Sequence, residues 1–258
     1  MTDNLNDILA LIVKSQREAA ELMLHAHNVL AQCKSGHRDV VTEYDKKIQA
    51  RLMERLTEAL PGAKFFCEEN MQRDDLGSGD VFIIDPIDGT MNFVRGFNHS
   101  CISVAYCRDG VLSAAAVYNP YVDEMFTAVK GGGAFLNGKK LSVYEGPLSD
   151  CVICCGTTPY DPQLSAQGFS LMKKAFDASL DIRRQGSAEL DLCSAAAGRA
   201  GVYFELLISL WDYAAGMLIV QEAGGLVLNL KGEPIRFDGE KTSVLAGGRQ
   251  AIEDFLKL

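Results

Sequence analysis

Two segments near the N-terminus carry apolar residues at helical spacing. In residues 5–30 leucine, isoleucine and valine recur three or four positions apart, and the same pattern returns between Thr42 and Leu60. Residues at this spacing line one face of an α-helix, so we predict two amphipathic helices. Pro61 and Gly62 end the second helix, because proline cannot continue a helix and glycine favours a turn.

The pattern then changes to short apolar runs rich in β-branched and aromatic residues. Turn-forming pairs such as Asp109-Gly110 and Asn137-Gly138 occur between or after these runs, which is typical of hairpins between antiparallel strands. The predicted strands are AKFFCEE, DVFIID, SCISVAYC, VLSAAAVYN and DEMFTAV. We therefore expect a largely antiparallel sheet in this part of the chain.

Beyond the polar stretch 144–150, strands and helices alternate. Strand-like CVICCG, DIRRQG and VYFEL are separated by helical patterns near 164–178 and 187–199, and a further helix starts at Trp211-Asp212. The strands LVLNL and SVLAGG and a short helix follow. This change of rhythm predicts a second lobe.

The composition fits a compact protein of two lobes. Of its 258 residues, 48% are apolar, which is enough for a sizeable core. We expect an α+β lobe over 1–145 and an α/β lobe over 146–258, with a cleft between them. No run approaches the roughly 18 apolar residues of a membrane span. The start of the chain, MTDNLNDILALIVKSQ, lacks the basic region of a signal peptide, so we expect a cytoplasmic protein that binds no membrane.

Charge and cysteine usage argue against two further classes of function. The formal net charge is −9, whereas nucleic-acid binding depends on clustered lysine and arginine, so we expect no direct nucleic-acid binding. The eight cysteines are scattered through apolar runs and read as reduced core thiols. Cys151, Cys154 and Cys155 could form a zinc site, but no second pair stands at matching spacing.

The densest chemical signal is IIDPIDGTMNF, residues 83–93. A buried strand ends there in Asp85, and Asp88 follows after one tight turn, so both carboxylates can point at hard cations. Pro86 holds the backbone such that the carbonyl of Ile87 can join them. Ligands that are all oxygen indicate Mg²⁺, or alternatively Mn²⁺.

The same loop also predicts an anion site. Gly89 and Thr90 open a short helical turn, where free N–H groups and the positive end of the helix dipole favour a phosphate. Cations and a phosphate would therefore meet in one loop. The competing interpretation is an aspartate-rich turn that merely caps a helix.

Other acidic residues could complete this site. Glu68 and Glu69 end a strand, and because side chains alternate along a strand, only one of them should face the cleft. Asp212 stands at a helix start, where a dipole alone would favour an acid. Asp45 has the same ambiguity, since Thr42 and Asp45 resemble a capping box.

Taken together, CEEN, DPIDGTMNF and WDYAAG, in this order, resemble the three signatures of the inositol monophosphatase family. The resemblance spans nearly the whole chain. It implies a layered αβαβα fold, usually in a dimer, and hydrolysis of phosphate monoesters with two or three Mg²⁺ ions that lithium displaces. Cys67 and Asn70 replace a glycine and a serine that are common in the first signature, while both glutamates remain.

The resemblance also implies a role for each matching residue. Metal ligands would be Glu68, Asp85, the Ile87 carbonyl, Asp88 and Asp212. Thr90 and Asp45 would activate the attacking water, the N–H groups of Gly89 and Thr90 would hold the phosphate, and Ser187, Ala188 and Glu205 would contact the organic group. Glu205 could instead be a strand-end glutamate in solvent. Lys34 falls near a family lysine that lies close to the metals, and Arg95 and His99 are ordinary loop residues as readily as ligands.

Two rival classes stay open. A haloacid-dehalogenase-type phosphatase also uses an aspartate-rich loop, but its aspartates are spaced differently and it forms a phosphoaspartate. The other class is a non-catalytic protein that interacts with the transcription machinery. Within the family, Asn92 replaces an acidic residue of enzymes that act on 3′-phosphoadenosine 5′-phosphate, so we expect inositol, sugar or polyol phosphates. Fructose 1,6-bisphosphate, histidinol phosphate and nucleotide monophosphates remain alternatives.

Overall fold

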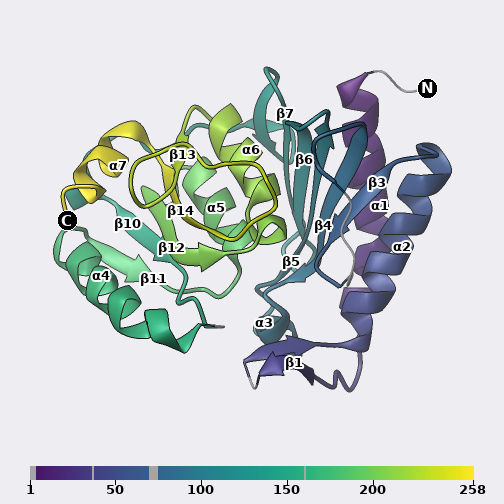
Figure 1. The fold of residues 1–258 in the computed structure, drawn as a ribbon, viewed down its shortest axis with the longest axis horizontal. Helices are drawn as coiled ribbons and strands as arrows, with labels where there is room; N and C mark the ends of the chain where they lie inside the picture. The colour runs from purple at the N-terminus through teal and green to yellow at the C-terminus, as the bar shows by residue number, and fades with distance from the viewer. Residues whose placement is uncertain (1–3, 37, 70–74, 160) are drawn as a thin grey trace.

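The structure is a computed structural model that describes residues 4–36, 38–69, 75–159 and 161–258. Its helices and strands stack in five layers, two helices, a sheet, two helices, a second sheet and two helices (Figure 1). This arrangement confirms the predicted αβαβα architecture. The position of Asn70, singled out in the first signature, lies outside the described residues.

Seven strands form the first sheet, in the order β3-β4-β5-β6-β7-β8-β9. They are β3 (Lys64–Cys67), β4 (Asp80–Asp88), β5 (Cys101–Arg108), β6 (Val111–Asn119), β7 (Glu124–Val129), β8 (Gly133–Leu136) and β9 (Lys139–Lys140). All neighbours pair antiparallel except β3 and β4, which are parallel. The predicted meander is confirmed, and its turns at Asp109 and Asn137 adopt the positive φ that such hairpins need.

Two long helices, α1 (Leu5–Leu24) and α2 (Glu43–Ala59), cover the outer face of this sheet (Figure 1). Their inward residues, such as Ile12 and Leu52, are fully buried. The α1 helix ends six residues before the predicted limit. A small hairpin, β1 (Gln32–Gly36) and β2 (Asp39–Val41), follows it and was not indicated by hydrophobic spacing. The capping box predicted at Thr42 begins α2, as expected.

The second sheet has the order β11-β10-β12-β14-β13. Its strands are β10 (Val152–Cys155), β11 (Asp181–Arg183), β12 (Val202–Ile208), β13 (Leu226–Leu228) and β14 (Thr242–Gly247). The first three are parallel, and β14 runs antiparallel to both its neighbours. Parallel strands need long crossovers, and the helices between these strands supply them.

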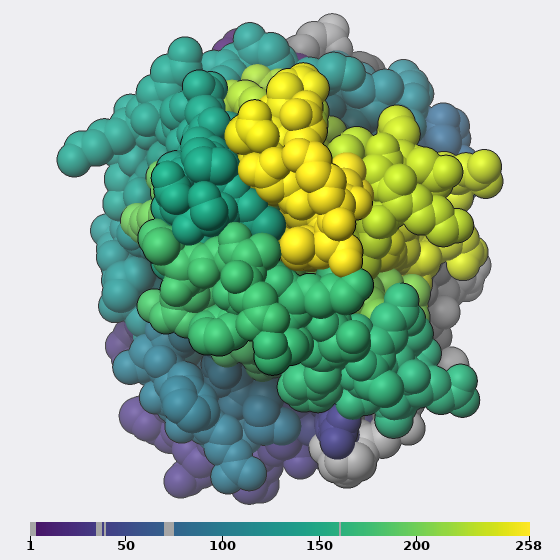
Figure 2. Space-filling view, turned by 90° about the vertical axis from the view of Figure 1, so that its left-hand side faces the viewer, coloured from purple at the N-terminus to yellow at the C-terminus, as the bar shows by residue number. Residues whose placement is uncertain are grey.

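The helices of this half form two layers. Between the two sheets lie α5 (Ala188–Ala196) and α6 (Ala214–Glu222), and on the outer face of the second sheet lie α4 (Ser165–Asp177) and α7 (Arg249–Phe255) (Figure 1). Figure 2 shows the green and yellow segments of this half at the surface of the molecule. Two short 3₁₀ turns also belong to this half: η1 (Leu148–Asp150) precedes β10, and η2 (Pro162–Leu164) precedes α4. Because α5 and α6 are packed on both sides, most of their residues are buried.

Two helix boundaries differ from the sequence expectation. The helix expected over 187–199 is limited to α5, and the one expected at Trp211 begins at Ala214, preceded by the 3₁₀ turn η3 (Leu210–Asp212). Periodicity alone does not separate a 3₁₀ turn from the helix that follows it.

We propose that the two lobes divide between β9 and η1, with α5 and α6 as the layer they share.

The cysteines lie mostly in the core. All eight are among the described residues and none of them forms a disulfide, and all but Cys33 are buried. Among the described residues, no helix is both long and apolar enough to span a bilayer.

Candidate active site

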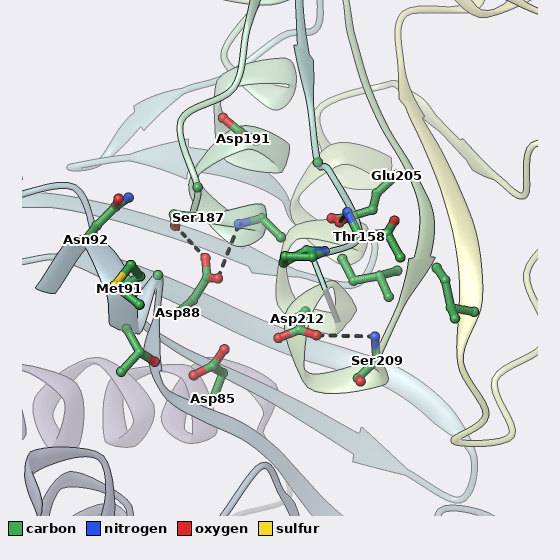
Figure 3. A pocket seen from close by; sticks show the side chains of 18 of the residues that line it. Asp85, Asp88, Met91, Asn92, Thr158, Ser187, Asp191, Glu205, Ser209 and Asp212 are labelled. Carbon is green, nitrogen blue, oxygen red and sulfur yellow. Dashed lines mark hydrogen bonds between the residues drawn. The ribbon is translucent and has the colours of Figure 1, made fainter. Parts of the chain in front are cut away.

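A cleft of about 530 Å³ opens between the two halves of the chain. The end of β4, the start of α3 (Thr90–Arg95), the start of α5, the strand β12 and the turn η3 form its walls (Figure 3). Elements from both sheets therefore meet at one place, as the sequence interpretation expected.

Three aspartates converge in this cleft. One carboxylate oxygen each from Asp85, Asp88 and Asp212 lie within 4.8 Å of one another (Figure 3). Within the described part of the chain, no other set of three or more acidic, histidine or cysteine side chains is gathered in this way. Sequence reasoning had named all three as metal ligands, although Asp212 lies more than a hundred residues after the other two.

Backbone N–H groups hold each aspartate in place. The register of β4 against β5 shifts between Asp85 and Asp88, which lets Asp85 accept a hydrogen bond from the Ile87 N–H at 3.0 Å. Asp212 is half-buried rather than exposed, and accepts the Ser209 N–H at 3.2 Å from within η3.

Asp88 is the most strongly bound of the three. Its carboxylate accepts hydrogen bonds from the Ser187 hydroxyl at 2.5 Å, the Glu189 N–H at 2.8 Å and the Ala188 N–H at 3.2 Å. These groups belong to the N-cap and first turn of α5, so Asp88 also satisfies N–H groups that a helix start leaves without partners. Ser187 and Ala188, which we expected to contact substrate, therefore line the cleft but bind Asp88.

The carboxylates of this cluster carry like charges and repel one another. Burial raises the pKa of Asp85 and Asp212, and the nearby carboxylates raise both further. Burial also raises the pKa of Asp88, against the lowering effect of its hydrogen bonds. Ionised aspartates this close, and removed from water, are costly unless a cation joins them. The donor set is all oxygen, which suits Mg²⁺ or Mn²⁺.

Glu68 lines the same cleft but stands outside the trio of aspartates. Burial raises its pKa to about 7, despite the opposing effect of Lys34. The ammonium of Lys34 lies 2.7 Å from Glu68 and also binds Glu69. Alternation does not separate the two glutamates here, because β3 ends at Cys67 and both follow in a turn. Glu69 is thus held by Lys34 and does not line the cleft.

A second group of polar residues adjoins Asp85. The hydroxyl of Thr90 lies 3.2 Å from Asp45 Oδ1 and 3.0 Å from the carbonyl oxygen of Ile87. Asp45 is fully buried and accepts the N–H and hydroxyl of Thr42 at 2.8 and 2.5 Å. Burial raises the pKa of Asp45, while the bonds from Thr42 lower it. The structure therefore gives Asp45 a capping role and a contact with Thr90 together.

Gly89 fits the loop for a steric reason. Its φ is +84°, and a Cβ atom there would lie 3.1 to 3.3 Å from atoms of Gly186, His99 and Ser187. Asn92, in the following helix, donates its amide hydrogens to the carbonyls of His99 and Gln185 at 2.7 and 2.8 Å. An ionised carboxylate in place of this amide would have no hydrogen to donate to either carbonyl.

Glu205 stands on the opposite wall, on β12 (Figure 3). It is buried rather than in solvent, and accepts the Thr158 N–H and the Tyr203 hydroxyl, each at 2.8 Å. Gly156 makes room for it, because a Cβ atom at Gly156 would lie 2.0 Å from the Glu205 carboxyl carbon. Burial raises the pKa of Glu205.

Sequence reasoning missed two buried acids on α5. Glu189 and Asp191 are 0% and 1% exposed, and burial raises the pKa of each to about 8. The available signal was two charged residues inside the apolar stretch SAELDLCSAA. Conversely, neither Arg95 nor His99, left out of the predicted site, lines the cleft.

The chain is similar to known proteins over nearly its whole length. The model of the inositol monophosphatase family matches residues 4–257. An inositol-1-monophosphatase of Rhizobium meliloti is 36% identical over 88% of this chain and 86% of its own. A protein of Neisseria meningitidis serogroup B named a putative Nus factor SuhB is 35% identical over 98% of both chains. The crystal structure of an IMPase/NADP phosphatase complexed with Mg²⁺ and phosphate has a TM-score of 0.88, with 26% identity over 98% of this chain and 95% of that one.

Proposed function

The chain belongs to the inositol monophosphatase family, and from its cleft we propose that it is a Mg²⁺-dependent phosphatase of inositol monophosphate or a related sugar or polyol phosphate. The observation that carries this proposal is the convergence of Asp85, Asp88 and Asp212. A phosphate ester is an anion, and these carboxylates and Glu68 would repel it. Arg38, Arg184 and Lys241 also line the cleft, but the part beside the aspartates suits a phosphate only together with cations.

We assign the metal ligands as Glu68, Asp85, the Ile87 carbonyl, Asp88 and Asp212. Mg²⁺ at this position supplies positive charge that offsets the phosphate oxygens and makes water more acidic. Two or three ions would fit the role the family implies. The structure that is complexed with Mg²⁺ and phosphate supports this assignment, because it shares the fold over nearly the whole chain.

Thr90 and Asp45 would prepare the attacking water. A water beside Thr90 can donate a hydrogen to its hydroxyl, whose own proton passes to Asp45 at 3.2 Å. Burial, which raises the pKa of Asp45, makes this carboxylate a better proton acceptor. The N–H groups of Gly89 and Thr90 would hold the phosphate, and attack in line with the departing alkoxide would need no covalent enzyme intermediate.

The organic group would lie toward β12. Each carboxylate oxygen of Glu205 accepts one hydrogen bond from the protein and has a second lone pair for a substrate hydroxyl. A polyol fits this chemistry, and Ser187 and Ala188 border the same space. Fructose 1,6-bisphosphate, histidinol phosphate and nucleotide monophosphates are the alternatives to be ranked by assay.

The test is phosphate release from a panel of inositol, sugar, histidinol and nucleotide phosphates, with Mg²⁺ and with or without lithium. Turnover that needs Mg²⁺, falls with lithium and disappears in Asp85→Asn is the expected result. Asp254→Asn is the matched control, because Asp254 lies on α7 and does not line the cleft. No turnover on any compound would overturn the proposal.

A second candidate is a role with the transcription machinery, favoured by the relative named a putative Nus factor. It needs a surface rather than the cleft, so binding to RNA polymerase should be the same for the wild-type protein and Asp85→Asn. Absence of binding by the wild-type protein would remove this candidate.

We also propose a homodimer. Phe97 and Val122 are 70% and 61% exposed, and Val122 borders a second hollow of about 540 Å³ beside His99. The family resemblance implies a dimer, and contact of these two side chains with a partner would remove apolar surface from water. Light scattering after size exclusion should give twice the chain mass, and the mass of one chain would refute the dimer.

A further inference from the structure

Glu189 connects two helices that adjoin the aspartates, α5 and α6. Its side chain is fully buried on the first turn of α5, and both its oxygens accept N–H groups from the first turn of α6. The distances are 3.1 Å from Ala215 N to Oε1 and 2.6 Å from Gly216 N to Oε2. The α6 helix has no side-chain cap of its own, so Glu189 supplies from another helix what a local cap usually supplies.

The backbone of the same residue contacts a predicted metal ligand. The N–H of Glu189 donates to Asp88 Oδ2 at 2.8 Å. Asp212 lies two residues before α6 begins. One residue thus binds the carboxylate of Asp88 through its backbone and the helix that follows Asp212 through its side chain.

Capping alone does not account for a carboxylate at this position. A neutral side chain at the start of α6 could accept the same N–H groups without burying a second acid next to Asp88. A carboxylate that binds two successive N–H groups fixes both the height and the rotation of α6 relative to α5. Gly216 allows this contact, because a Cβ atom there would lie 2.7 Å from Glu189 Oε2.

We propose that Glu189 is a positioning residue that sets the separation of Asp88 and Asp212 and thereby the affinity of the metal site. This inference rests on the metal site of the proposed function, although not on any particular substrate. Partners that orient metal ligands typically change metal affinity or activity by about 10- to 100-fold when they are removed. Removal of the Glu189 side chain should weaken metal affinity by a factor in this range.

The experiment is a Mn²⁺ titration of the full chain, read from the electron paramagnetic resonance signal of unbound Mn²⁺. Glu189→Ala should weaken binding about 10- to 100-fold. Glu189→Gln keeps the shape of the side chain but offers one acceptor oxygen instead of two, so it should weaken binding less. Ile12→Ala is the control for lost stability, because Ile12 is buried on α1 in a different part of the core, and its Mn²⁺ affinity should be unchanged.

Three results would overturn the inference. They are wild-type affinity in Glu189→Ala, an equal loss of affinity in Ile12→Ala, and a wild-type chain that binds no Mn²⁺. Phosphate release is measured separately on the same samples. If the wild-type chain releases no phosphate while Glu189→Ala still loses Mn²⁺ affinity, the proposed activity is wrong and the positioning role stands.

Discussion

Replacing Asp85 with asparagine should stabilise the metal-free protein while it removes activity. The asparagine keeps an oxygen for the Ile87 N–H, which now lies 3.0 Å from Asp85 Oδ1. It removes one negative charge from a buried carboxylate whose pKa is raised by burial and by the neighbouring carboxylates. A buried group without a partner costs about 1–3 kcal/mol, so we expect a gain of roughly 1–3 kcal/mol in the free energy of unfolding.

Magnesium should reverse this order of stability. A chain of this size gains about 2–4 °C in melting temperature per kcal/mol, so Asp85→Asn should melt about 2–12 °C above the wild-type protein in chelator. A ligand at about a thousand times its Kd stabilises the folded state by about 4.1 kcal/mol. The wild-type protein should gain this in excess Mg²⁺, whereas the variant should gain little.

Differential scanning calorimetry at pH 8, with chelator and with Mg²⁺, measures both effects. Activity provides the second readout, and kcat/KM should fall about 10²- to 10⁴-fold because Lewis-acid stabilisation is worth several kcal/mol. Asp254→Asn is the control, and it should lower the stability of the protein instead of raising it. Hydrogen bonds from Lys257 and the Leu148 N–H favour the charged form of Asp254 and lower its pKa. A variant that is less stable than wild type in chelator, or that gains as much from Mg²⁺, would refute the electrostatic reasoning.

Three further predictions follow from the same geometry. Folding raises the pKa of Glu68 to about 7 and the pKa of Glu189 and Asp191 to about 8, so the folded protein binds more protons than the unfolded chain. Without metal, the melting temperature should therefore fall as the pH rises from about 5 to about 9. A melting temperature that rises over this range would contradict the assigned shifts. Gly156→Ala should displace the side chain of Glu205. Because charged hydrogen bonds are worth about 1.5–3 kcal/mol, KM should rise about 10- to 100-fold with little change in kcat. An unchanged KM in steady-state assays would exclude Glu205 from substrate binding. Thr90→Ala should lower kcat about 10²- to 10⁴-fold while Thr90→Ser retains most of it, and equal losses in the two variants would argue against a role for the hydroxyl.

The order of helices and strands could be predicted from hydrophobic spacing and turn residues. The long helices, the antiparallel meander and the alternating second half all appear in the structure. The hairpin of β1 and β2 could not, because its strands are short and lack an apolar alternation. The 3₁₀ turn before α6 was also missed, because its apolar and acidic residues continue the helical pattern.

The convergence of Asp85, Asp88 and Asp212 was expected only because three signatures together resembled one family. Nothing in the spacing of residues 85 and 212 places them within one metal site, since that depends on how α6 packs against the first sheet. The hydrogen-bond partners of the buried acids could not be predicted from the sequence for the same reason. The contacts of Glu189 with α6, and of Glu205 with Thr158, join residues that are distant along the chain.

The aspartates are held by the protein before any cation binds. Asp85, Asp88 and Asp212 each accept at least one backbone N–H, from a turn, from the start of α5 and from η3 respectively. Each carboxylate is therefore oriented by the folded protein, and their mutual repulsion lowers the stability of the metal-free protein. Because the ligands are already ordered, little of the binding free energy of a cation is lost to ordering them. Such a site trades stability without metal for affinity toward metal, and this is why one amide substitution should shift the two in opposite directions.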